Sequence, residues 1–67
     1  MDHQAKHRIE RLPQVLERTG LSRSTLYALL SRNEFVQPVR LSARAIGFVT
    51  AEVDGWIMAR AAQRGAR

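Results

Sequence analysis

A short run of hydroxyl and arginine side chains is the part of this sequence best suited to binding chemistry. It reads Gly20-Leu21-Ser22-Arg23-Ser24-Thr25-Leu26-Tyr27. A guanidinium has the reach and the forked donors to bind a guanine edge or to clamp a phosphate. Small hydroxyls suit a phosphate at the start of a helix. Because a glycine followed by a capping serine is typical of the turn in a helix-turn-helix, the run predicts a helix whose first turn faces DNA.

The predicted DNA-binding side chains come from this helix and from a loop further along the chain. Tyr27 lies one turn from Arg23 and can donate its hydroxyl to the DNA backbone, and Ala28 is placed to touch a thymine methyl. In the loop, Arg40 and Arg44 suit a wing that lies along the backbone or in the minor groove. The full predicted set is Ser22, Arg23, Ser24, Thr25, Tyr27, Ala28, Arg32, Arg40 and Arg44.

Each of these side chains also has a structural alternative. The hydroxyls can simply cap a helix. Tyr27 can be a half-buried aromatic of the core, and the two loop arginines can belong to a solvent-exposed polar turn. With a helix before the run and a hairpin after it, the pattern favours DNA binding.

The distribution of charge indicates a polyanionic partner. The chain has eleven basic and six acidic residues, a net charge of +5. From Arg18 to Arg44, five arginines stand against one acid, Glu34, which gives this stretch a charge of +4. A basic surface of this kind is expected of a nucleic-acid-binding domain. The alternative is a solvated arginine-rich surface without a ligand.

The composition excludes several other classes of protein. Sixty-seven residues make one small domain, and without cysteine neither a disulfide nor thiolate-bound zinc can support its core. His3 and His7 lie in a polar lead, and we expect no metal site and no cofactor. No catalytic set or phosphate loop can be assembled, so we expect no enzyme and no small-molecule substrate. No segment is apolar enough for export or a membrane, which predicts a cytoplasmic, nucleoid-associated protein.

Apolar spacing and capping residues predict two short helices in the first half. Leu12, Val15 and Leu16 repeat with helical spacing, which predicts a helix over 12–19 that ends at Gly20. Ser22 is expected to cap a second helix over about 23–32, whose apolar face is Leu26, Leu29 and Leu30, with Asn33 as its stop.

A hairpin and a third helix follow. The pattern alternates over 39–41 and 46–49, which predicts a two-stranded hairpin joined by residues 42–45. Thr50 is expected to cap a helix that buries Val53, Trp56 and Ile57, with Trp56 as the anchor of the core. The expected fold is mostly α with a small β-hairpin, a winged helix-turn-helix in the order helix-helix-hairpin-helix. Its bounds are a disordered N-terminal lead over 1–8, the domain over 9–64 and a tail over 65–67.

Several blocks of the sequence together resemble the AlpA family of prophage regulators. They are Arg11-Leu12-Pro13-Gln14-Val15, Thr19 to Tyr27, Phe35-Val36-Gln37-Pro38-Val39-Arg40-Leu41, Arg44-Ala45-Ile46-Gly47-Phe48 and Glu52-Val53-Asp54-Gly55-Trp56-Ile57. The resemblance covers about residues 9–60 and implies a MerR-like winged helix-turn-helix related to excisionases. It also implies DNA binding near integrase or excision genes of mobile elements.

The sequence departs from that family pattern in two places. The family usually has tryptophan where this chain has Phe48, a change that keeps a buried aromatic. It often has proline, glycine or lysine where this chain has Glu34 and Val36. Glu34 is therefore expected either to weaken contact with DNA or to lie just outside the interface.

These observations predict a sequence-specific regulator of a prophage or integrative element that binds double-stranded DNA, or an excisionase-like factor. The helix over about 23–32 is expected in the major groove and the wing on the backbone or in the minor groove. A single small module binds DNA weakly, so self-association as a dimer or on repeated sites is expected. Two alternatives stay open, namely a protein-interaction adaptor without its own DNA site and a binder of structured RNA.

Overall fold

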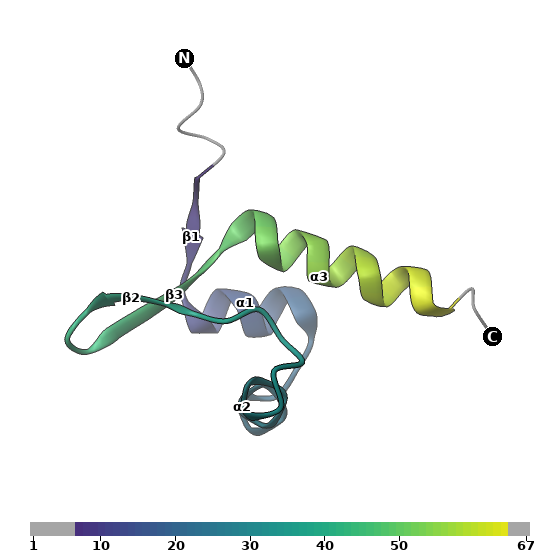
Figure 1. The fold of residues 1–67 in the computed structure, drawn as a ribbon, viewed down its shortest axis with the longest axis horizontal. Coiled ribbons are helices and arrows are strands. Elements are labelled where there is room, and N and C mark those ends of the chain that lie inside the picture. The colour runs from purple at the N-terminus through teal and green to yellow at the C-terminus, as the bar shows by residue number, and fades with distance from the viewer. Residues whose placement is uncertain (1–6, 65–67) are drawn as a thin grey trace, which may run out of the picture.

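Three helices and a small antiparallel sheet form the fold (Figure 1). The computed structural model describes residues 7–64. The elements in chain order are β1 (Ile9–Glu10), α1 (Leu12–Thr19), α2 (Arg23–Ser31), β2 (Val39–Ser42), β3 (Ala45–Val49) and α3 (Thr50–Gln63). This arrangement confirms the predicted fold class, a mostly helical chain with a hairpin that is consistent with a winged helix-turn-helix.

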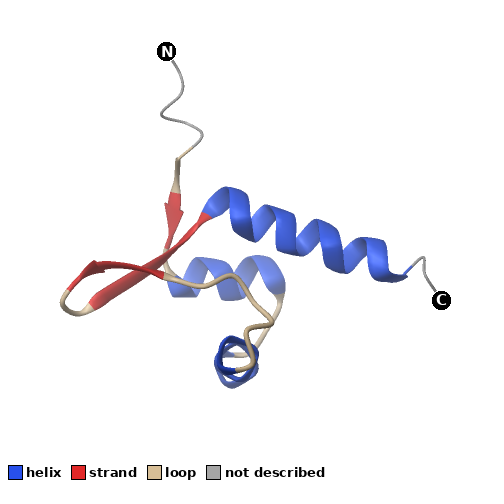
Figure 2. Cartoon of the chain, in the orientation of Figure 1, coloured by secondary structure: helices blue, strands red, loops and turns tan. Residues whose placement is uncertain are grey.

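The helix-turn-helix forms where the sequence predicts it. Gly20 ends α1 with a φ of 75°, and its N–H donates to the Leu16 carbonyl. That left-handed conformation favours glycine because it has no Cβ. Ser22 caps α2, and Asn33 follows the helix with a φ of 58°. Figure 2 shows α2 end-on while α1 runs across the view, so the two helices cross steeply.

The sheet contains one strand more than predicted. Its order is β1-β3-β2, with both pairings antiparallel. The strand β1 pairs Ile9 with Val49, and two residues are too few to produce the alternation by which a strand is recognised. The hairpin connection is also shorter than the predicted 42–45, because Ser42 pairs directly with Ala45.

The predicted cap of the third helix is wrong. Val49 is the N-cap of α3 and makes no side-chain capping bond, while Thr50 is already helical. The strand β3 runs straight into the helix, so no loop residue is available to cap it. Instead the Thr50 N–H donates to the Arg8 carbonyl over 2.8 Å. Residues 1–6 of the predicted lead and the predicted tail, 65–67, lie outside the described residues.

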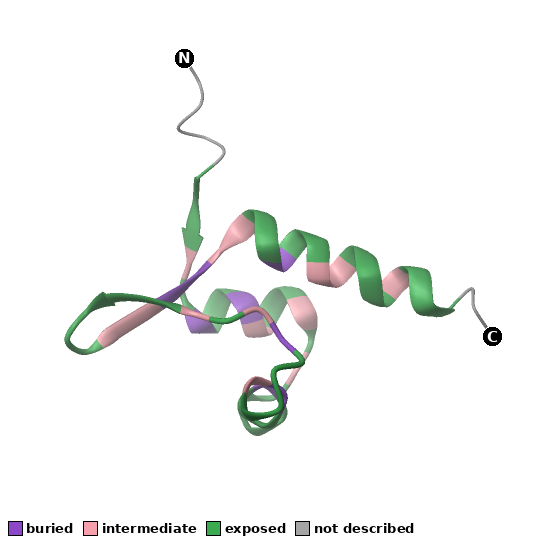
Figure 3. Cartoon of the chain, viewed as in Figure 1, coloured by how far each residue is buried: buried purple, intermediate pink, exposed green. Residues whose placement is uncertain are grey.

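One apolar cluster holds the elements together (Figure 3). Its largest fully buried side chains are Phe48 from β3, Leu26 from α2, and Val15 and Val53 from α1 and α3. Phe48 thus keeps a buried aromatic, as expected. Trp56 packs at the edge of this cluster and not at its centre. The Trp56 ring lies edge-on to Phe35, with 4.7 Å between ring centroids.

Two glycine-to-alanine changes are expected to have opposite effects on stability. A Cβ at Gly47 would run into the Ile9 side chain and stand 3.2 Å from the Glu10 carbonyl oxygen. Such overpacking costs about 1–3 kcal/mol. At Gly55, inside α3, a Cβ meets nothing within 4 Å, so Gly55→Ala should add about 0.5–1 kcal/mol of stability through helix propensity. Urea unfolding measures both changes. A Gly47→Ala protein as stable as the parent would contradict the described packing of β1 on β3.

Candidate nucleic-acid interface

All nine side chains of the predicted DNA-binding set are exposed. Seven lie in or at the ends of α2, and two lie in the hairpin (Figure 3). The apolar face of α2 takes Leu26 and Leu29 into the core, so the opposite side of the helix is open to solvent. The structure therefore presents the set on the surface of two elements and assigns none of it to the core.

The start of α2 is fixed by hydroxyl groups. The Thr25 N–H donates to Ser22 Oγ over 3.1 Å, and Ser22 Oγ donates to Thr25 Oγ1 over 2.9 Å. Ser22 therefore caps the helix, which is the structural alternative given above for the hydroxyl side chains. This cap satisfies only part of the first turn, whose remaining N–H groups have no helical acceptor. The positive end of the helix dipole and these donors make the start of α2 suitable for a phosphate.

Tyr27 belongs to the exposed face of α2. Tyr27 is 47% exposed and is not among the side chains that form the apolar cluster or pack against it. Residues four apart share one side of a helix, which places Tyr27 beside Arg23. A forked cation and an aromatic hydroxyl thus stand one turn apart on the same exposed surface.

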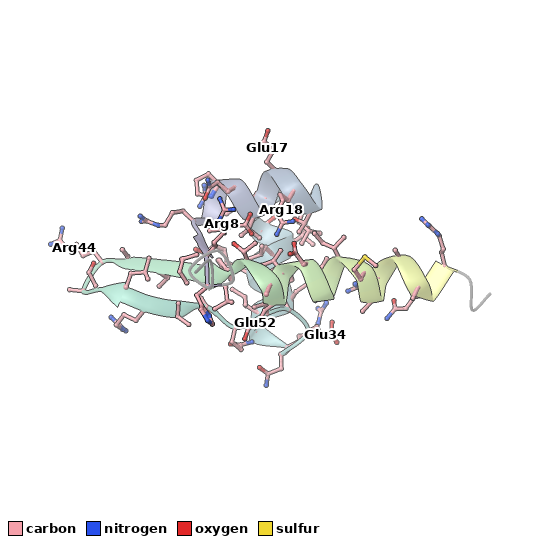
Figure 4. The ribbon with its side chains drawn as sticks, turned by 90° about the horizontal axis from the view of Figure 1, so that it is seen from above. Arg8, Glu17, Arg18, Glu34, Arg44 and Glu52 are labelled. Atoms are coloured by element: carbon pink, nitrogen blue, oxygen red, sulfur yellow. The ribbon has the colours of Figure 1, made fainter. Side chains whose placement is uncertain are left out.

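The hairpin carries its arginines outside the core. Every residue of β2, including Arg40, is exposed. Arg44 lies in the two-residue turn, where its backbone N–H stands 3.4 Å from Ser42 Oγ, and Figure 4 shows its side chain at the hairpin tip. The hairpin therefore has the shape and charge of a wing that can lie against a polyanion.

The arginines differ in whether a carboxylate already holds them. Arg18 bonds Glu10 of β1 and Asp54 of α3, each at 2.8 Å. The Glu10 carboxylate first, and then that of Asp54, raise the pKa of the Arg18 guanidinium above its ordinary value. Within residues 7–64, no ion pair involves Arg23, Arg40 or Arg44. Arg18 thus links elements of the fold. The charge of +4 counted from the sequence is therefore larger than the positive charge that is available to bind a polyanion.

The network around Arg18 could not be found from the sequence. Glu10, Arg18 and Asp54 come from three separate elements, and only the strand β1 brings the first of them beside α1. No local spacing pattern marks a pairing of this range. The network joins the first strand, the first helix and the third helix on the surface of the domain.

The described residues offer no other evident centre for chemistry. Two open hollows of about 430 and 300 Å³ lie beside α3 and β1. Between residues 7 and 64, no group of three His, Cys, Asp or Glu side chains is placed to hold a metal ion. Over the same part of the chain, no helix is long and apolar enough to span a bilayer.

Sequence similarity to known proteins extends over nearly the whole of the described fold. The family model of the prophage CP4-57 regulatory protein (AlpA) matches residues 8–61. The DNA-binding transcriptional activator AlpA of Escherichia coli (strain K12) is 32% identical over 66 residues, which cover 90% of this chain and 94% of that protein. The uncharacterized protein ORF88 of Enterobacteria phage P4 is 37% identical over 59 residues, covering 88% of this chain and 67% of that protein. No solved structure matches the chain.

Arg18→Gln is expected to lower the free energy of unfolding by about 0.5–1 kcal/mol, because two carboxylates lose an exposed but shared partner. The loss should shrink at high salt, which screens the ion pairs. Arg44→Gln removes the same charge from the hairpin tip and should leave stability unchanged. Chemical unfolding at low and high salt measures both variants. Equal losses in the two proteins would contradict the structural role of Arg18.

Proposed function

We propose that this chain, which belongs to the AlpA family of prophage regulatory proteins, is a sequence-specific regulator of transcription that binds double-stranded DNA. The observation that carries the proposal is the exposed arginine surface of α2 and the hairpin, in which Arg23, Arg40 and Arg44 have no carboxylate partner within residues 7–64. The relative from Escherichia coli, named a DNA-binding transcriptional activator, supports the same class of function. The regulated DNA would belong to a prophage or integrative element.

In the proposed complex, α2 enters the major groove by its first turns. Arg23 points a forked donor at a base edge, where guanine offers two acceptors. Ser24 and the free N–H groups of the first turn hold a phosphate. Tyr27 and Ala28 lie one turn further on, where they meet the backbone and a thymine methyl. This division assigns base discrimination mainly to Arg23 and orientation to the groups around it.

The hairpin supplies the second contact. Arg40 and Arg44 lie on the wing and neutralise phosphates or enter the minor groove beside the site read by α2. If about four or five phosphates are neutralised in all, the logarithm of the binding constant should fall against the logarithm of salt concentration with a slope of about −4. A domain of this size gains affinity from a second copy on a neighbouring half-site.

Selection from a randomised duplex library, followed by fluorescence anisotropy on the selected site, tests the proposal. Arg23→Ala should cost about 1–3 kcal/mol of binding free energy and relax the preference for one base. Arg44→Ala should weaken binding to every duplex and reduce the salt slope by about one. Arg64→Ala, which removes an arginine outside the predicted set, is the control for charge and should change affinity least.

Three outcomes would contradict the proposal. A parent protein with no salt-dependent affinity for any duplex would indicate an adaptor that binds protein. Preference for structured RNA over duplex DNA of equal length would indicate an RNA-binding function. Undiminished binding by both Arg23→Ala and Arg44→Ala would place the DNA contact elsewhere on the domain.

A further inference from the structure

One arginine of the predicted set differs from the others because a carboxylate holds it. Arg32 Nε lies 3.3 Å from Glu34 Oε1, and the two side chains are 60% and 52% exposed. Arg32 is the C-cap of α2, so its guanidinium stands at the far end of the helix proposed to enter DNA. An exposed pair of this kind is weak. A phosphate can therefore compete with Glu34 for Arg32.

The backbone of Glu34 is anchored even though its side chain is exposed. Its N–H donates to the Leu29 carbonyl over 2.8 Å, and its carbonyl accepts from Trp56 Nε1 over 3.0 Å. Asn33 before it is held in the left-handed conformation. Glu34 is thus tied to α2 on one side and to α3 on the other. This fixes where its negative charge stands relative to the end of α2.

The other cation beside Glu34 is engaged elsewhere. Arg60 lines the same open hollow as Glu34, but its guanidinium lies over the Trp56 ring at 4.8 Å from the centroid. Within residues 7–64, the Glu34 carboxylate forms an ion pair with Arg32 and with no other residue. The negative charge of Glu34 therefore acts mainly on the guanidinium of Arg32.

We propose that Glu34 attenuates the affinity of this domain for DNA by holding Arg32 away from the phosphate backbone. This inference rests on the proposed function. Arg32 must leave Glu34 to reach a phosphate, and Glu34 then remains near the polyanion as an unpaired negative charge. Because phosphate contacts carry no sequence information, the attenuation acts on all duplexes alike. It limits the sequence-independent binding of a domain with a net charge of +5.

The test compares four proteins on the selected duplex and on a scrambled duplex: the parent, Glu34→Gln, Arg32→Gln and the double variant. Glu34→Gln should tighten binding to both duplexes by about 5-fold near physiological salt. It should also steepen the salt slope by up to about one, because the charge of Arg32 is then no longer offset by Glu34. In the Arg32→Gln background the same change should have little effect. Trp56, the single tryptophan of the chain, bonds the Glu34 carbonyl, so an unchanged fluorescence spectrum verifies that the loop is intact.

Glu17→Gln is the matched control for net charge. Glu17 is exposed on α1, and in Figure 4 it points to the opposite edge of the molecule from Glu34. This variant should change affinity by less than 2-fold. Equal tightening by Glu17→Gln and Glu34→Gln would overturn the inference, and so would full tightening by Glu34→Gln in the absence of Arg32. A parent that binds no duplex would instead overturn the proposed function.

Discussion

The strand β3 lies at the centre of the sheet and packs Phe48 against side chains from all three helices. This strand pairs with both other strands, delivers Phe48 to the centre of the core and continues directly into α3. It also packs against α1. The helix-turn-helix, the wing and the third helix are therefore positioned by one five-residue segment. Within residues 7–64 the buried apolar side chains form one cluster, so the packing of Phe48 is shared by all the elements that this cluster joins.

Local signals in the sequence predicted the elements near the proposed reading helix. Gly20 and Ser22 specify the end of α1 and the start of α2 through their own backbone and side-chain chemistry, so no tertiary information is needed. The same reasoning failed at Thr50. Its residue type suits a cap, but the strand leaves no room for a non-helical residue there. The capping preference of a residue type does not decide where a helix begins when a strand continues directly into that helix.

The sequence predicted that the candidate residues are exposed, but it did not predict which of their charges are paired. Exposure of the seven side chains in or at the ends of α2 follows from the apolar face that this helix must bury, which periodicity reveals. Which arginines are free depends on partners from other elements, and those are set by tertiary contacts. Arg18 and Arg32 look equivalent in the sequence. In the structure, one joins three elements and the other makes a single contact with a near neighbour. The binding of DNA by this surface stays a proposal.

The direct junction between β3 and α3 restricts where the chain of this domain can change in length. At that junction Val49 is both the last residue of the strand and the N-cap of the helix, so an inserted residue would rotate α3 and shift Val53 out of the core. The turn at Ala43 and Arg44 faces solvent and carries no such obligation. Length variation is therefore tolerated at the tip of the wing and not at its base. The length and charge of the wing tip can thus change without moving α3 or the core.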